Sequence, residues 1–497
     1  VRDMVVSRLF GAGFATDAFF AAFIIPNMLR RFFAEGALTS AFVPTFSEWL
    51  SQKGEEEARE LANVCFTLLT VVMAAVTAAG IIFSPAIVSL MYPGFSAQAN
   101  KLELTILLNR LMFPYLFFIS LVALCMGILN TVRHFFTPAI STVFLNLSMI
   151  LCALFLHRRF EVPILSLAVG VLLGGVLQLL LQLPVLYRRG FPLRFRFRPR
   201  HPAVSRIALL MGPSIFGVGV YYLNITVSNI LASLLPQGSV SYLYYAQRLF
   251  EFPQGIFTVS IAQAVLPSLS RQAAAGEMAG MRESLDFGIR LTLFITIPAM
   301  VGLLLSCTPV FSLLFMGGEF DYLKAAASSE ALWYYSLGLP AVALVRVLVP
   351  GFYALKDTRT PVITAAAAFV LNLLFSLALM GPLRHGGLAF ATTLSAGGNL
   401  ALLVFFLRRK IGPFGTGVFS TLWRTAAASL PMALFVRYVL TLADWSAPGG
   451  KVLKGVVLGG GVGGGAAVFA AGAWLLGCAE AREAGNLFLS RLRRRRG

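Results

Sequence analysis

The stretch FATDAFFAAFIIPNMLRRFFAEGALTSAFVPTF, residues 14–46, decides how this chain folds. It is apolar over a length sufficient to cross a bilayer, yet it contains two consecutive arginines, Arg30 and Arg31. A cation at membrane depth is costly, and it is retained where it has a partner or a function. Arg30 and Arg31 are therefore candidate functional residues.

The composition of the whole chain also indicates that this protein folds in a lipid bilayer. Of 497 residues, 58% are hydrophobic and 12% are charged, and the mean hydropathy is +0.81. These values are typical of an integral membrane protein. A membrane-spanning helix needs roughly 17 to 25 apolar residues. About thirteen such runs follow a shorter one at residues 1–10, and they begin near Phe14, Leu61, Leu104, Thr137, Val162, Arg206, Tyr242, Phe287, Ala331, Pro361, Gly386, Phe419 and Leu453.

These runs predict an all-α integral membrane protein with about fourteen transmembrane helices. The apolar runs are continuous and contain Gly and Pro, whereas the strands of a membrane barrel would alternate in polarity. Because the chain opens on Val1, we expect the first helix to be cut short.

The distribution of Lys and Arg between successive loops predicts the orientation. One set of loops is rich in them, including residues 188–200 and 408–410 and the tail 491–496. The alternate loops contain only Lys101, Arg158, Arg159, Lys324, Arg384 and Lys451. We therefore expect both termini in the cytoplasm. The net charge of +19 resides mainly in the rich loops, which indicates contact with membrane lipids and no binding of nucleic acid.

The two halves of the chain resemble each other with a period of about 220 residues. Phe83-Ser-Pro85 matches Cys307-Thr-Pro309, and Arg30 matches Arg248. Two copies with the same orientation form a parallel repeat, which is typical of transporters with a cavity between two rocking bundles. The repeat predicts an N-lobe at 1–190, a basic cytoplasmic loop at 191–205, a C-lobe at 206–410, a further helix pair at 411–480 and a basic tail at 481–497.

The buried charges are the candidate binding residues of this cavity. We expect Arg30, Arg31 and Arg248 to point into it, with Arg2, Asp3 and Asp17 nearby. Guanidinium groups suit phosphate because they form planar, bidentate hydrogen bonds and stay charged. Pro26 with Gly36, and Pro253 with Gly255, predict a kink beside each arginine.

Two features leave a structural alternative open. Arg2 could pair with Asp3 or Asp17, and Arg30 or Arg31 with Glu35, as static ion pairs. The glycine-rich run at 455–465 could be a close-packing helix face or a groove for a lipid tail. The four histidines show no metal-ligand spacing, so we predict no metal centre.

Several motifs resemble the MurJ (MviN) lipid II flippases. They are Arg2-Asp3, Gly13-Phe-Ala-Thr-Asp17, Pro26-Asn-Met-Leu-Arg30-Arg31, Ala41-Phe-Val-Pro44 and Glu251-Phe-Pro253. The resemblance implies a member of the multidrug/oligosaccharidyl-lipid/polysaccharide exporter superfamily that moves undecaprenyl-pyrophosphate-linked peptidoglycan precursor from the inner to the outer leaflet of the bacterial cytoplasmic membrane. It also implies that Arg2, Arg30 and Arg248 line the headgroup cavity, and that the last two helices hold the polyprenyl tail.

The resemblance has departures that affect energy coupling. Some family members bind sodium through carboxylates in the second lobe, where this chain offers the neutral Asn372 and Ser376. We expect no cofactor, and coupling to the membrane potential or to a monovalent ion stays open. We expect a monomer whose partners are lipid II and membrane lipids.

Two other classes of function compete with this one. A MATE-like exporter or an O-antigen-type flippase would share the architecture, although a cavity for cationic drugs would need carboxylates. An enzyme acting on polyprenyl phosphates would need paired acids or histidines, often with magnesium, and no such motif is present.

Overall fold

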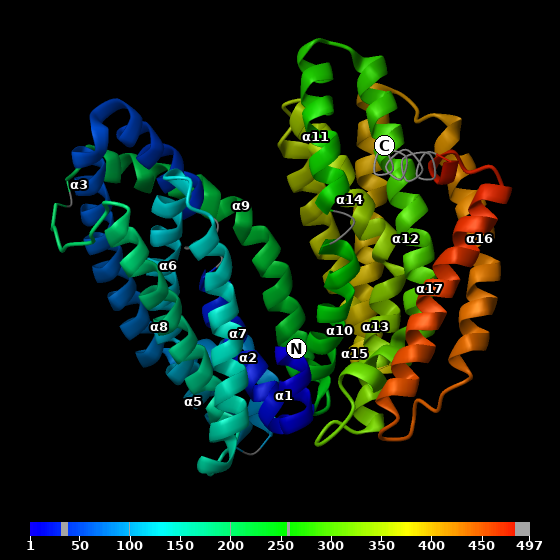
Figure 1. Ribbon diagram of the computed structural model, residues 1–497, viewed down its shortest axis with the longest axis horizontal. Coiled ribbons are helices and arrows are strands. Elements are labelled where there is room, and N and C mark those ends of the chain that lie inside the picture. Colours follow the sequence, from blue (N-terminus) through cyan, green and yellow to red (C-terminus); the bar gives the residue numbers. More distant parts are fainter. Residues whose placement is uncertain (31–37, 99, 199, 256–258, 483–497) are drawn as a thin grey trace, which may run out of the picture. The chain divides into compact units, whose positions relative to one another are not determined.

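The computed structural model describes residues 1–30, 38–98, 100–198, 200–255 and 259–482, and their regular elements are helices (Figure 1). The all-α prediction is confirmed. Among the described helices, seven are long and apolar enough to cross a membrane, or eight if the bent pair Tyr322–Leu337 and Leu339–Ala354 is one span. The total of fourteen stays a prediction.

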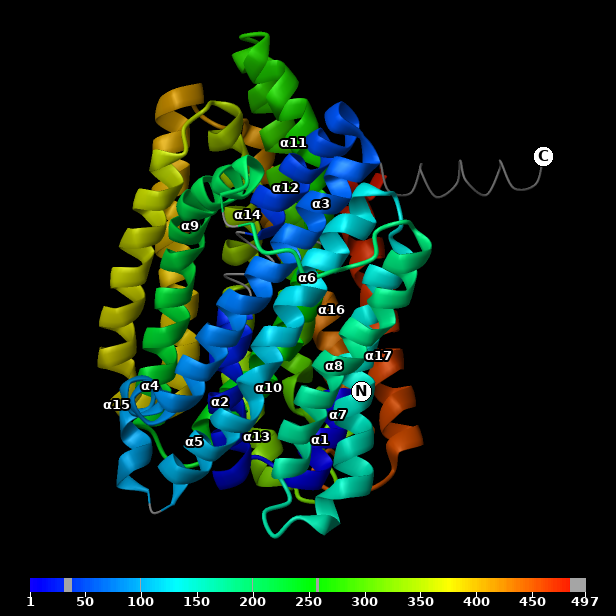
Figure 2. The same ribbon diagram turned by 90° about the vertical axis from the view of Figure 1, so that its left-hand side faces the viewer.

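The chain forms two compact units, Val1–Ser241 and Tyr242–Gly497. The helices of the first unit are α1 (Arg2–Phe10), α2 (Phe14–Arg30), α3 (Thr39–Ile82), α4 (Ser84–Met91), η2 (Pro93–Ala97), α5 (Lys101–Met112), α6 (Pro114–Thr131), α7 (Phe136–Leu156), η3 (His157–Arg159), α8 (Leu165–Arg188) and α9 (Pro202–Ser233). Within this unit, α7 packs along α8, and α3 packs against α6 and α9 (Figure 2). The predicted lobe boundaries rest on the repeat and stay a prediction.

The second unit begins within α10 (Ser239–Pro253): its first three residues belong to the first unit and the rest to the second. The remaining helices of the second unit follow it. They are α11 (Val259–Ala274), α12 (Met278–Leu314), α13 (Tyr322–Leu337), α14 (Leu339–Ala354), α15 (Arg359–Ile411), α16 (Thr416–Leu440) and α17 (Lys451–Leu475). The helices α16 and α17 pack against each other and both contact α12, as Figure 1 shows.

Two of the long helices are interrupted by a residue with positive φ. Gly54 divides α3 with φ 83°, and Arg384 divides α15 with φ 48°. Each half of the 53-residue α15 is therefore about the length of one span. Asn372 in the first half donates to Thr392 and Ser395 in the second, so the two halves lie against each other.

The start of α15 is held by a capping carboxylate. Asp357 accepts hydrogen bonds from the backbone N–H of Thr360, at 3.0 Å, and from its hydroxyl, at 2.6 Å. These bonds hold the pKa of Asp357 well below its usual range, and an ion pair with Lys410 adds to the effect. A carboxylate at a helix N-terminus also suits the helix dipole.

The basic loop after α8 is attached to α3. The side chain of Phe191 is buried and its ring lies 5.7 Å from that of Phe46. The backbone N–H groups of Arg194 and Arg196 donate to Asn63 and Thr67, both on α3. The backbone of the loop is thus bonded to α3 at these two residues, while the side chains of Arg194 and Arg196 are exposed.

The glycine-rich run of α17 has two kinds of surroundings. A Cβ at Gly464 or Gly465 would meet Phe435 or Val436 of α16 at less than 3 Å, so these glycines allow close helix packing. A Cβ at Gly459, Gly460 or Gly463 would meet nothing within 4 Å. The close-packing interpretation therefore holds for one face of α17.

We predict that Gly387→Ala destabilises the fold by about 1–3 kcal/mol, because a Cβ there would lie 2.3 Å from the carbonyl oxygen of Leu379. Thermal unfolding of the purified protein in detergent measures the loss. The matched control is Gly397→Ala in the same half of α15, where a Cβ meets nothing within 4 Å. An unfolding temperature of Gly387→Ala equal to that of the control would contradict the prediction.

Candidate functional site

Arg30 is the last residue of α2 and lines a cavity inside the first unit. Its Nε donates to Oδ1 of Asn27 at 3.0 Å, which orients the guanidinium. The cavity has a volume of about 120 Å³ and is bounded by residues of α2, α6, α7 and α8. Besides Arg30, its polar side chains include Asn130 and Gln178, and much of the remaining wall is apolar. An arginine beside a cavity of this kind can bind an anionic group.

Arg2 and Asp3 form an ion pair at the start of α1. Both Nε and Nη2 of Arg2 donate to Oδ1 of Asp3, at 3.0 and 2.8 Å. Nη1 of Arg2 also lies 4.0 Å from the sulfur of Met149 on α7. The structure thus contains the Arg2–Asp3 ion pair, one of the two static pairs that the sequence allows for Arg2. A role of either residue in binding substrate stays a prediction.

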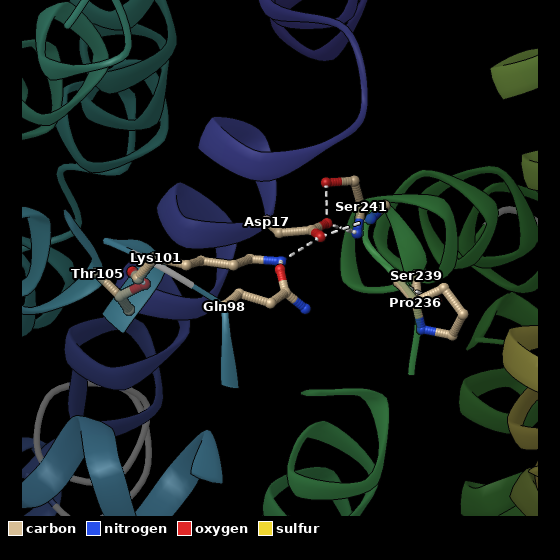
Figure 3. Close-up of polar contacts among 8 residues, drawn as sticks. Asp17, Gln98, Lys101, Thr105, Pro236, Ser239 and Ser241 are labelled. Atoms are coloured by element: carbon tan, nitrogen blue, oxygen red, sulfur yellow. Dashed lines mark hydrogen bonds and ion pairs between the residues drawn. The ribbon is translucent and has the colours of Figure 1, made fainter. Parts of the chain in front are cut away.

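Asp17 lies in the first turn of α2 and is almost fully buried, with 1% exposure. Its Oδ2 accepts from Nζ of Lys101, at 2.9 Å, and from the backbone N–H of Gly238, at 2.7 Å. Its Oδ1 accepts from the backbone N–H and the hydroxyl of Ser241, at 2.9 and 2.6 Å. Figure 3 shows the carboxylate between Lys101 and Ser241. Asp17 therefore joins α2, α5 and the start of α10.

The contacts of Asp17 decide between two alternatives and correct one expectation from the sequence. Of the two pairings open to Arg2, the structure contains the one with Asp3, and the charged partner of Asp17 is Lys101. Lys101 itself was expected in a loop, but it is the first residue of α5 with 1% exposure. It also donates to Gln98 and lies 4.3 Å from the ring centroid of Phe95. A buried ammonium needs a carboxylate, and Asp17 supplies it.

Arg248 lies on α10 in the second unit. Its Nη1 is 3.0 Å from Oε2 of Glu251, and its guanidinium lies 5.1 Å from the ring centroid of Tyr244. Both members of the ion pair are partly exposed. The convergence of Arg248 and Arg30 on one cavity stays a prediction.

The predicted kink residues fall at different places. Pro26 lies inside α2, which continues to Arg30. Pro253 is the last residue of α10, Gln254 and Gly255 continue it in a π-helical conformation, and residues 256–258 lie outside the described part of the chain. Arg31 and Gly36 lie outside the described residues.

The sodium candidates Asn372 and Ser376 are both buried in α15, with 2% and 1% exposure. The amide nitrogen of Asn372 faces the hydroxyls of Thr392 and Ser395, each at 3.4 Å. The group offers neutral oxygens only, and the described part of the chain contains no cluster of three or more His, Cys, Asp or Glu side chains suited to a metal. Asn372 and Ser376 stay weak sodium candidates, and the expectation that this chain has no metal site stays a prediction.

Comparison with known families shows to which family this chain belongs. Residues 6–450 match the family model "Lipid II flippase MurJ". The chain belongs to the lipid II flippase MurJ family. The matched residues include Asp17, Arg30 and Arg248, while Arg2 and Asp3 precede them.

Relatives of known name agree with the MurJ assignment. The chain is 39% identical to a probable lipid II flippase MurJ of Vibrio cholerae, over 90% of this chain and 86% of that protein. It is 34% identical to the lipid II flippase MurJ of Burkholderia cenocepacia, over 92% and 90% of the two chains. A solved structure of lipid II flippase MurJ in an inward closed conformation matches with a TM-score of 0.79 and 26% identity, over 95% of each chain.

A multidrug resistance MATE transporter of the MOP superfamily in an inward-facing conformation also matches. Its TM-score is 0.71 at 15% identity, over 82% of this chain and 93% of that one. At that identity the likeness concerns the fold alone. The MurJ assignment therefore rests on the closer sequence matches.

We predict that Asp17→Asn lowers the free energy of unfolding by about 3–5 kcal/mol, because it leaves the buried ammonium of Lys101 without a counter-charge. Thermal unfolding of the purified protein measures this loss. The double variant Asp17→Asn with Lys101→Met removes both charges and should recover much of the stability. A double variant no more stable than Asp17→Asn would show that the ion pair is not the cause.

Proposed function

We propose that this chain moves lipid II from the inner to the outer leaflet of the bacterial cytoplasmic membrane by alternating access. The observation that carries the proposal is the match to the MurJ family over residues 6–450, together with relatives named lipid II flippase at 34% and 39% identity. The apolar helices of the described chain suit a multi-pass membrane protein. We also propose that both termini lie in the cytoplasm, because the distribution of Lys and Arg among the loops favours this orientation.

Arg30 is the proposed contact for the pyrophosphate. It is oriented by Asn27 and lines a cavity whose wall is largely apolar. In such surroundings an arginine bound to a phosphate gains more than it would in water, because competing solvent is reduced. Arg248 is the proposed second contact, with Glu251 as its partner when substrate is absent.

Because Arg2 is paired with Asp3, its role differs from that of Arg30 and Arg248. Two donors of its guanidinium are already bound to Asp3, so the pair carries little net charge. We propose that Arg2 contacts the headgroup while Asp3 limits its mobility. The protein acts as a monomer without a cofactor, and a monovalent ion or the membrane potential drives the conformational cycle.

The competing functions have weaker support. A MATE-like exporter shares the fold at 15% identity, and the candidate residues here are arginines, which suit anions. A polyprenyl-phosphate enzyme would not explain relatives that are named flippases.

We predict that this chain restores growth to a bacterium depleted of its own lipid II flippase, and that Arg30→Ala abolishes the rescue. Loss of one charged donor to phosphate should reduce lipid II transport in proteoliposomes at least about ten-fold. Arg30→Lys should restore only part of the activity, because an ammonium lacks the planar fork.

The matched control is Arg409→Ala, which removes an exposed arginine at the end of α15. The amount of each variant in the membrane is measured in parallel. Full rescue by Arg30→Ala would refute the role of Arg30, and no rescue by the unmodified chain present in the membrane would refute the proposed function.

A further inference from the structure

The cavity beside Arg30 contains an acceptor that the fold does not use. Gln178 of α8 lines this cavity and is 2% exposed. Its Nε2 donates to the backbone carbonyl of Ser141 at 3.1 Å, which fixes the orientation of the amide. No group in the described part of the chain donates to its Oε1. A buried carbonyl without a donor is unfavourable, so a bound group that supplies an N–H or O–H would stabilise the site.

The rest of the cavity restricts what that donor can be. Ile119, Val122 and Met126 of α6 form an apolar wall, and Arg30 places a positive charge at the same cavity. A cationic donor would be repelled by Arg30. An anion would find no donor in the Oε1 of Gln178. The lining therefore suits a neutral group with one N–H or O–H and an apolar part.

The volume of the cavity exceeds the need of a single water molecule. About 120 Å³ is available, against roughly 10–15 Å³ of accessible space for one water. Water alone would leave the apolar wall of α6 hydrated, which is costly. A ligand with a methyl group beside its N–H would cover this wall and satisfy Gln178 at once.

We infer that this cavity is a subsite for an acetamido group of a sugar, with Gln178 as the acceptor for its N–H. The inference rests on the proposed function, because peptidoglycan sugars carry 2-acetamido groups and the first of them is joined to the pyrophosphate proposed to contact Arg30. The methyl of the acetamido group packs against Ile119, Val122 and Met126, and Gln178 becomes a specificity-determining residue.

The test compares three lipids in binding to the purified full chain. Two are undecaprenyl-pyrophosphate-linked hexoses that differ only at C2, one with an acetamido group and one with a hydroxyl. The third is undecaprenyl pyrophosphate. Wild type should bind the acetamido lipid about ten-fold more tightly than the hydroxyl lipid, because one hydrogen bond and one buried methyl are gained.

Gln178→Met should reduce this preference to less than about two-fold, because it keeps the volume of the side chain and removes the acceptor. Its binding of undecaprenyl pyrophosphate should not change. The matched control is Gln182→Met, one turn further along α8, which removes a buried glutamine that does not line the cavity. A second variant, Ala123→Leu, fills the cavity from α6 and should abolish the preference without altering Gln178.

The outcomes separate the subsite from the proposed function. Equal binding of the two sugar lipids by wild type, or an unchanged preference in both Gln178→Met and Ala123→Leu, would overturn the subsite and leave water as the occupant of the cavity. Failure of wild type to bind any of the three lipids would overturn the proposed function and the subsite with it.

Discussion

The buried ion pair between Asp17 and Lys101 is the constraint on which the position of the candidate site depends. A charge removed from water is tolerated when its partner and its remaining hydrogen bonds are supplied. Asp17 meets this condition with four hydrogen bonds, which come from α5 and from residues at the start of α10. Arg30 is at the other end of α2, roughly 20 Å away at 1.5 Å per residue. Fixing Asp17 therefore fixes the helix that places Arg30 at its cavity.

The same requirement governs the C-terminal helices in the second unit. Lys454 of α17 is buried and donates to the hydroxyl of Ser312 on α12, at 2.9 Å, and to the carbonyl of Ala447. At the other end of α17, the buried Glu480 accepts from Thr421 of α16 and pairs with Arg290 of α12. Polar contacts thus fasten the start of α17 to α12, and Glu480, which follows α17, joins α16 and α12 at the opposite end. Small residues let α16 and α17 approach closely between these contacts.

The sequence could predict what depends on local pattern and could not predict contacts between distant helices. Long apolar runs gave the helices, since a bilayer leaves the backbone few other ways to satisfy its hydrogen bonds. The pair of Arg2 and Asp3 was foreseeable because the residues are adjacent. The pair of Asp17 and Lys101 was not, since 84 positions separate them and each reads locally as a single charge.

Gln178 escaped prediction for a different reason. One glutamine in an apolar helix usually marks a polar contact between helices, and its nitrogen does make such a contact with Ser141. Only the three-dimensional structure reveals that none of the described residues donates to its oxygen, which lies beside a cavity. A repeating pattern of polar and apolar residues cannot show whether a particular side-chain oxygen has a hydrogen-bond donor.

The pairing of Arg30 with Gln178 offers a physical account of how the site would distinguish its substrate from bulk lipid. If Arg30 binds phosphate as proposed, a phospholipid headgroup would satisfy it as well, and phospholipids greatly outnumber any lipid-linked sugar in a membrane. An arginine alone would therefore be occupied mainly by the wrong ligand. A phospholipid without a neutral donor beside its phosphate leaves the Oε1 of Gln178 unpaired and the apolar wall uncovered. Specificity then arises from what the competitor fails to satisfy, which is the usual way that a buried polar group discriminates between ligands.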